Sequence, residues 1–96
     1  MSGKKRPNTR AVKQQLFLNC GRVDMYSMEE YAKCKLELHH DPPFRYSHHT
    51  IYEESYLLSA DHHRELHYLE QHDIEEYNRR MDIIKENKNI LERRKK

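Results

Sequence analysis

The chain has 96 residues, of which 35% are hydrophobic and 35% are charged, and its formal net charge is +2. A chain of this length supports one small core, so two folded domains are excluded. The hydrophobic share is below the ~45–50% of an average domain, and we expect a metal, a partner or oligomerisation to supplement the core. No apolar run reaches the roughly 18–20 residues of a membrane span, and the basic start lacks the apolar region of a signal peptide. We therefore expect a cytoplasmic protein with no membrane contact.

Charge is segregated along the chain. Residues 1–22 carry six basic side chains and no acid, whereas residues 23–67 carry nine acids and four bases, a net charge of −5. A basic terminus suits contact with phosphate, but an acidic middle segment is unfavourable for lying on DNA. Residues 1–8 have no apolar periodicity, so we expect a disordered basic arm ahead of a single domain at 9–96.

The first half of the domain predicts two short helical segments and a strand. A helical apolar face begins at Thr9 and ends before Gly21, a residue type favoured just beyond a helix end. The capping-box pattern that starts at Ser27 predicts a second short helical segment, which would end near Cys34. Residues 35–39 alternate polar and apolar side chains, which is typical of a half-buried strand.

The second half predicts a loop, a strand and a long helix. Two consecutive prolines end the first strand, and residues 44–54 show no clean period, which indicates irregular structure. Residues 55–58 predict a second strand that could pair with the first as a hairpin. Ser59 or Asp61 then caps one long helix, whose apolar stripe continues for more than six turns. Its polar far end, 86–96, is expected to project or fray.

Histidine is the unusual residue, with eight in the chain and six of them in adjacent pairs. His63 and His67 are four positions apart, so on a helix both imidazoles can reach one ion. If the two strands pack as a hairpin on the start of that helix, His39 or His40 supplies the third imidazole. Neighbours on a strand point to opposite faces, so only one of that pair would bind the ion.

A segment covering about a third of the chain resembles the HNH family of ββα-metal finger nucleases, and the colicin DNases most of all. The shared pattern is the pair His39-His40, an interval of 23 residues to the next ligand, and a final His-x-x-x-His on a helix. The resemblance implies an α+β, mostly helical protein with a ββα-metal core at 35–75. It also implies that His39, His63 and His67 bind the metal and that His40 is the general base that activates water.

Other site residues follow from the same resemblance. The family's middle asparagine, which braces the loop, corresponds to Glu54, nine positions before His63. Glutamate accepts hydrogen bonds but cannot donate an amide N–H, so it can brace the loop only in part. Arg64 or Arg45 could clamp a phosphate. Three imidazole nitrogens favour Zn²⁺ over Mg²⁺, which prefers oxygen ligands, and Mn²⁺ and Ni²⁺ are further alternatives.

Two functions remain open at this point. The first is a small metal-dependent endonuclease that nicks DNA, with the basic arm adding sequence-independent affinity. The second is a catalytically silent, zinc-stabilised module that binds a host protein, such as a phage anti-CRISPR inhibitor of a CRISPR effector nuclease. The histidine pair favours the nuclease, whereas Glu54 and the acidic middle segment favour the silent module. A structural zinc site that uses Cys20 or Cys34 with helix histidines is a third alternative.

Overall fold

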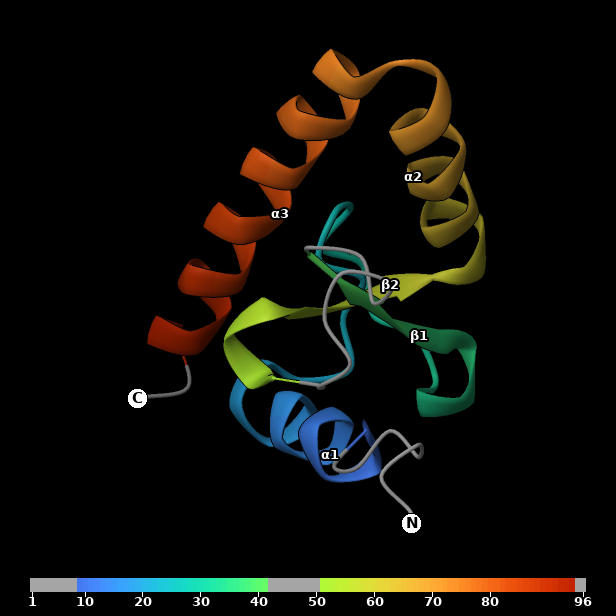
Figure 1. Cartoon of the computed structure of the whole chain (residues 1–96). Helices are drawn as coiled ribbons and strands as arrows, with labels where there is room; N and C mark the ends of the chain where they lie inside the picture. Colours follow the sequence, from blue (N-terminus) through green and yellow to red (C-terminus); the bar gives the residue numbers. More distant parts are fainter. Residues whose placement is uncertain (1–8, 42–50, 95–96) are drawn as a thin grey trace, which may run out of the picture.

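A computed structural model describes residues 9–41 and 51–94, and it is an α+β fold in which three helices surround a two-stranded hairpin (Figure 1). The predicted basic arm at 1–8 and most of the predicted irregular loop, with its two prolines and Arg45, lie outside the described residues. None of the helices in the described parts combines the length and the apolar character needed to span a bilayer.

The first helix agrees with its prediction. Helix α1 spans Thr9–Cys20 and buries Val12, Leu16 and Cys20, which recur at helical spacing on one face. Gly21 follows with a φ of +88° and donates its backbone N–H to the carbonyl of Phe17. Such a left-handed residue closes the last helical turn, and glycine adopts it without a Cβ penalty.

The second short helical segment is present only as the 3₁₀ turn η2, Lys33–Lys35. The predicted capping box does not form, because the carboxylate of Asp24 accepts the backbone N–H groups of Tyr26 and Ser27 and so builds a tight turn there. Met28 continues this turn with a φ of 67°. Side-chain hydrogen bonds to the nearby backbone thus replace the helix that the sequence pattern favoured.

The predicted hairpin forms with shifts of one residue at its ends. Strand β1, Leu36–His40, pairs antiparallel with β2, Ser55–Ser59, in a register that sets Leu36 opposite Ser59 and His40 opposite Ser55. The 3₁₀ turn η4, Tyr52–Glu54, leads into β2. All five residues of β2 are buried, because helices pack around it.

The single long helix predicted after the hairpin is wrong, since the chain folds it into two. Helix α2 spans Ala60–His72 and begins at the predicted cap Ser59, while α3 spans Ile74–Arg94. The non-helical residue Asp73 separates them, and its carboxylate accepts the backbone N–H of Glu76, so it acts as the cap of the second helix. Figure 1 shows the two helices diverging from this junction, with the hairpin between their far ends.

The core lies between the hairpin and the helices and contains the apolar stripe of α3. The far end of that helix does not project, because Lys88 and Leu91 are buried there. Fourteen buried apolar residues form one cluster: Val12, Leu16, Cys20, Val23, Met25, Leu36, Tyr56, Leu57, Leu58, Leu66, Tyr77, Met81, Ile84 and Leu91.

Candidate metal centre

The hairpin and α2 bring three imidazoles together. His39 comes from β1, and His63 and His67 come from successive turns of α2. One nitrogen from each ring lies within 4.8 Å of the others, and the ring centroids are 4.6–5.8 Å apart. This group could hold a metal ion. Of the two candidates on β1, His39 is therefore the one that joins the helix histidines.

His39 is the buried member of the cluster, with 3% of its surface exposed. Burial, followed by the nearby His63, His67 and His40, lowers the pKa of His39 to about 3. The imidazole is therefore neutral near pH 7, which is the form that offers a lone pair to a metal.

A second set of contacts fixes how the ring of His39 is protonated. Its Nε2 lies 3.1 Å from the hydroxyl of Tyr77 on α3, and that hydroxyl donates to the carboxylate of Asp41 at 3.2 Å. Because the tyrosine's one proton goes to the carboxylate, its oxygen accepts the Nε2–H of His39. That tautomer leaves the lone pair on Nδ1.

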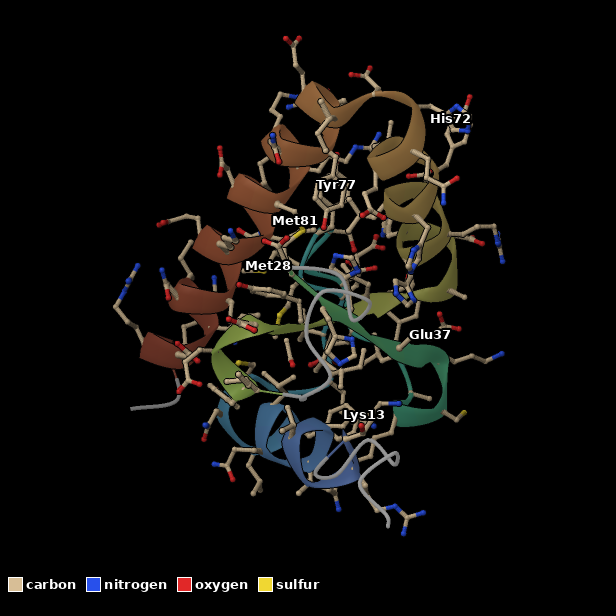
Figure 2. All side chains as sticks on the ribbon, in the orientation of Figure 1. Lys13, Met28, Glu37, His72, Tyr77 and Met81 are labelled. Atoms are coloured by element: carbon tan, nitrogen blue, oxygen red, sulfur yellow. The ribbon has the colours of Figure 1, made fainter. Side chains whose placement is uncertain are left out.

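His63 is oriented in a similar way. Its Nδ1 lies 2.8 Å from the Glu37 carboxylate on the neighbouring strand β1, so Nδ1 carries the proton and Nε2 carries the lone pair. That Nε2 is 3.1 Å from Nε2 of His67. Carboxylate–imidazole pairs of this kind accompany metal-binding histidines and raise their basicity. Figure 2 labels Glu37 on β1 and Tyr77 on α3.

The burial of the three rings differs, and this leaves one side accessible. His39 is buried, His63 is partly buried and His67 is exposed. Three nitrogen ligands on a partly open surface leave room for further ligands on an ion, as in catalytic zinc sites, whereas structural sites are closed by four protein ligands.

Two other predicted residues, His40 and Glu54, lie on the two paired arms of the hairpin. His40 ends β1 beside His39 and is partly buried. Glu54 lies in η4, where its backbone carbonyl accepts the N–H of Asp41 at 2.9 Å. This contact continues the antiparallel pairing of the hairpin by one residue pair beyond His40 and Ser55.

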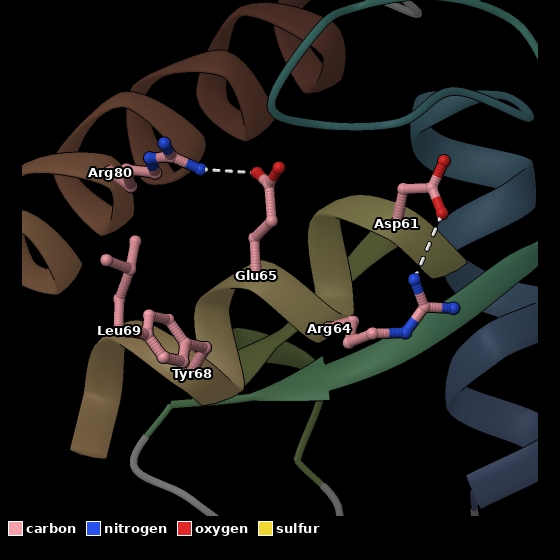
Figure 3. Close-up of a pocket in the computed structure, with 6 residues that line it drawn as sticks. All are labelled: Asp61, Arg64, Glu65, Tyr68, Leu69 and Arg80. Carbon is pink, nitrogen blue, oxygen red and sulfur yellow. Dashed lines mark hydrogen bonds and ion pairs between the residues drawn. The ribbon is translucent and has the colours of Figure 1, made fainter. Parts of the chain in front are cut away.

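Arg64 points to a different surface. Its guanidinium is 3.2 Å from Asp61, and both residues line a pocket of about 620 Å³ between α2 and α3. Figure 3 shows this pocket, with Glu65 and Arg80 paired across it and Tyr68 at its edge. In this arrangement the guanidinium of Arg64 pairs with Asp61, and its role as a phosphate clamp stays a prediction.

The cysteines take no part in the cluster. Cys20 is buried and lies 4.0 Å from the hydroxyl of Tyr52, while Cys34 is exposed. Among residues 9–41 and 51–94, the one cluster of potential metal ligands consists of histidines alone. The alternative of a cysteine-containing zinc site therefore has no support in the described part of the chain.

Sequence reasoning missed one polar centre next to the cluster. Asp24 is fully buried and accepts hydrogen bonds from Nδ1 of His62 at 2.7 Å and from the backbone N–H of Ser59 at 2.9 Å. His62 is therefore held on a different face of α2 from His63, and it does not substitute for that residue. The signal in the sequence was a lone aspartate 38 positions from its partner, which no local pattern reveals.

Comparison of the chain with protein-family models, curated proteins and solved structures found no match.

Proposed function

We propose that the protein is a metal-dependent DNA endonuclease of the HNH type, which nicks DNA with a histidine as general base. The observation that carries the proposal is the convergence of His39, His63 and His67 from a strand and a helix, with His40 next in the chain. The element order strand, strand, helix and the positions of these three histidines are what supports the proposal, whereas Glu54 stands where the resemblance would place an asparagine.

Zinc is the ion that the donor set favours. Three neutral imidazole nitrogens suit a borderline cation such as Zn²⁺, whereas Mg²⁺ prefers oxygen ligands. A bound ion of this kind polarises a phosphoryl oxygen and neutralises developing charge. The protein supplies the orientation, because Glu37 and Tyr77 fix the protonated nitrogens of His63 and His39.

The proposed role of His40 is to take a proton from the attacking water. The water oxygen forms a bond to phosphorus while the bond from phosphorus to the leaving sugar oxygen breaks, and that oxygen gains a proton from solvent. His40 suits this role because it adjoins a metal ligand and ends β1 at the edge of the cluster.

A nicking assay on supercoiled plasmid tests the proposal. The protein, cleared of metal and reloaded with Zn²⁺, Mn²⁺, Ni²⁺ or Mg²⁺, is expected to nick with at least one of these ions, and H40A is expected to lose that activity while it keeps the metal. The matched control is H72A, which removes an exposed histidine at the far end of α2. Nicking by H40A at the wild-type rate would exclude the assigned base.

A catalytically silent, zinc-stabilised module that binds a host protein is the second candidate. Two observations favour it: Arg64 is paired with Asp61, and the α2–α3 pocket presents the 60%-exposed ring of Tyr68. An exposed aromatic beside an apolar pocket is a common anchor point in protein interfaces. One equivalent of bound metal with no cleavage under any of the four ions would favour this function over the nuclease.

A further inference from the structure

A groove beside α1 is lined by two exposed cations, Arg22 and Lys33. The groove has a volume of about 390 Å³ and is lined by Gln14, Phe17, Leu18, Gly21, Arg22 and Lys33. Arg22 and Lys33 are exposed, and neither forms an ion pair with any residue at 9–41 or 51–94. By contrast, the arginines Arg64, Arg79 and Arg80 all pair with carboxylates.

An aromatic ring lies at the centre of these charges. The Nζ atoms of Lys13 and Lys33 are 6.0 and 5.3 Å from the centroid of Phe17. Leu18, one residue further along α1, is 70% exposed. Cations around an accessible apolar surface form the pattern that proteins use to follow a nucleic-acid backbone, where phosphates meet the cations and the ring contacts a sugar or a base.

The groove also continues the charge pattern of the chain. Residues 1–22 contain six basic side chains and no acid, so α1 extends a basic segment that begins at the amino terminus. Figure 2 shows Lys13 on α1 at one end of the molecule and His72 at the other end, near the junction of α2 and α3.

We propose that the α1 groove, together with Lys13 beside its Phe17 ring, binds the phosphodiester backbone of duplex DNA. The choice of DNA as the ligand rests on the proposed function. Two surfaces would then have separate roles. The histidine cluster would carry out the chemistry, and the groove would supply sequence-independent affinity that depends on salt.

The test is fluorescence anisotropy of a labelled DNA duplex with the full chain, in EDTA, over a range of salt concentrations. The variant K13Q/R22Q/K33Q is expected to bind the duplex at least about tenfold more weakly than the wild type. Because each phosphate contact contributes about 0.9 to the slope of log K against log salt, the loss of three contacts should reduce the magnitude of that slope by about 2–3. The control R79Q/R93Q/R94Q removes the same charge from α3, and its slope is expected to stay near that of the wild type. Equal slopes for the two triple variants would overturn the inference.

Two further arms separate this inference from the proposed nuclease function. H40A is expected to bind the duplex as the wild type does. If the wild-type protein binds DNA through the groove but nicks it with none of the four ions, the nuclease proposal fails and the groove proposal stands. Nicking without groove-dependent binding would count against the groove alone. A polyglutamate peptide that binds the groove more tightly than the duplex would assign this surface to an acidic protein and overturn the DNA assignment.

Discussion

The hydroxyl of Tyr77 connects the third helix to the buried histidine of the hairpin, since it lies 3.1 Å from Nε2 of His39. The same hydroxyl donates to Asp41, whose other carboxylate oxygen is 3.0 Å from Nζ of Lys85. A chain of contacts thus runs from Lys85 on the surface of α3 to the buried imidazole of His39. Burial and the neighbouring Asp41 raise the pKa of Tyr77, so the hydroxyl keeps its proton at neutral pH.

We expect Y77F to weaken metal binding by about 10- to 100-fold, because loss of the hydroxyl removes the partner that selects the Nδ1 lone pair of His39. The ring is retained, so packing in the core is preserved. Competition with a chromophoric chelator for Zn²⁺ measures the change. Y68F is the control, since Tyr68 lies at the edge of the α2–α3 pocket, and an unchanged affinity in Y77F would show that the hydroxyl does not support the ligand.

Adjacent histidines at the start of α2 are expected to have separable roles. H63A should lose metal binding and keep most of its metal-free stability, because His63 is a partly exposed member of the cluster. H62A should keep the metal but lose about 1–3 kcal/mol of unfolding free energy, because it removes a hydrogen bond to the buried carboxylate of Asp24. Metal content by mass spectrometry and urea unfolding in EDTA measure the two effects. Loss of metal in both variants would contradict the assignment.

This contrast shows what the sequence could reveal. The spacing of His63 and His67 and the alternation along 35–39 are local patterns, so they predicted the ligands and the strand that carries the third one. The break at Asp73 had a local signal that the apolar periodicity outweighed, since Asp73 accepts the backbone N–H of Glu76 three positions later as a helix cap. The Asp24–His62 pair, by contrast, joins residues 38 positions apart. Such long-range contacts override local propensity and are not encoded in any short window of sequence.

The protonation of Asp24 is expected to make the free energy of unfolding depend on pH in the acid range. Burial alone would raise its pKa, but hydrogen bonds from His62 and from the backbone of Ser27 and Ser59 outweigh that effect, and the pKa lies below 3.8. At a pH where the Asp24 carboxylate of the unfolded chain has begun to take up a proton, the same carboxylate is still ionised in the folded state. Its contribution to stability is fully present above about pH 4 and is lost as the pH falls through the lower folded value.

D24N is expected to be less stable than the wild type at pH 6, because one amide oxygen replaces two carboxylate oxygens that accept four hydrogen bonds. It should also lose less stability than the wild type between pH 4 and about pH 2.5, since asparagine does not titrate. Urea unfolding in EDTA at several pH values measures both. If the unfolding free energies of D24N and the wild type fall in parallel over that pH interval, Asp24 does not have the lowered pKa.

Lys88 explains why the polar end of α3 packs instead of fraying. The residue is 5% exposed, and its Nζ donates to the backbone carbonyls of Tyr52 at 2.6 Å and Ser55 at 3.0 Å while it lies over the rings of Tyr52 and Tyr56. Burial lowers the pKa of the amine. The lysine thereby fastens α3 to η4 and to the start of the strand β2.

Two opposing effects decide the outcome of K88M. Removal of a buried charge is favourable, since its desolvation no longer opposes folding. However, the substitution removes two hydrogen bonds from a buried ammonium group, of which only the Tyr52 carbonyl keeps a described second donor, the backbone N–H of Ser55. We expect this loss to dominate at about 2–3 kcal/mol of unfolding free energy. K85M, which removes an exposed lysine from the preceding turn, should cost less than about 1 kcal/mol. If urea unfolding finds K88M as stable as the wild type, desolvation of the lysine offsets its hydrogen bonds, and the junction of α3 with η4 is held by apolar packing instead.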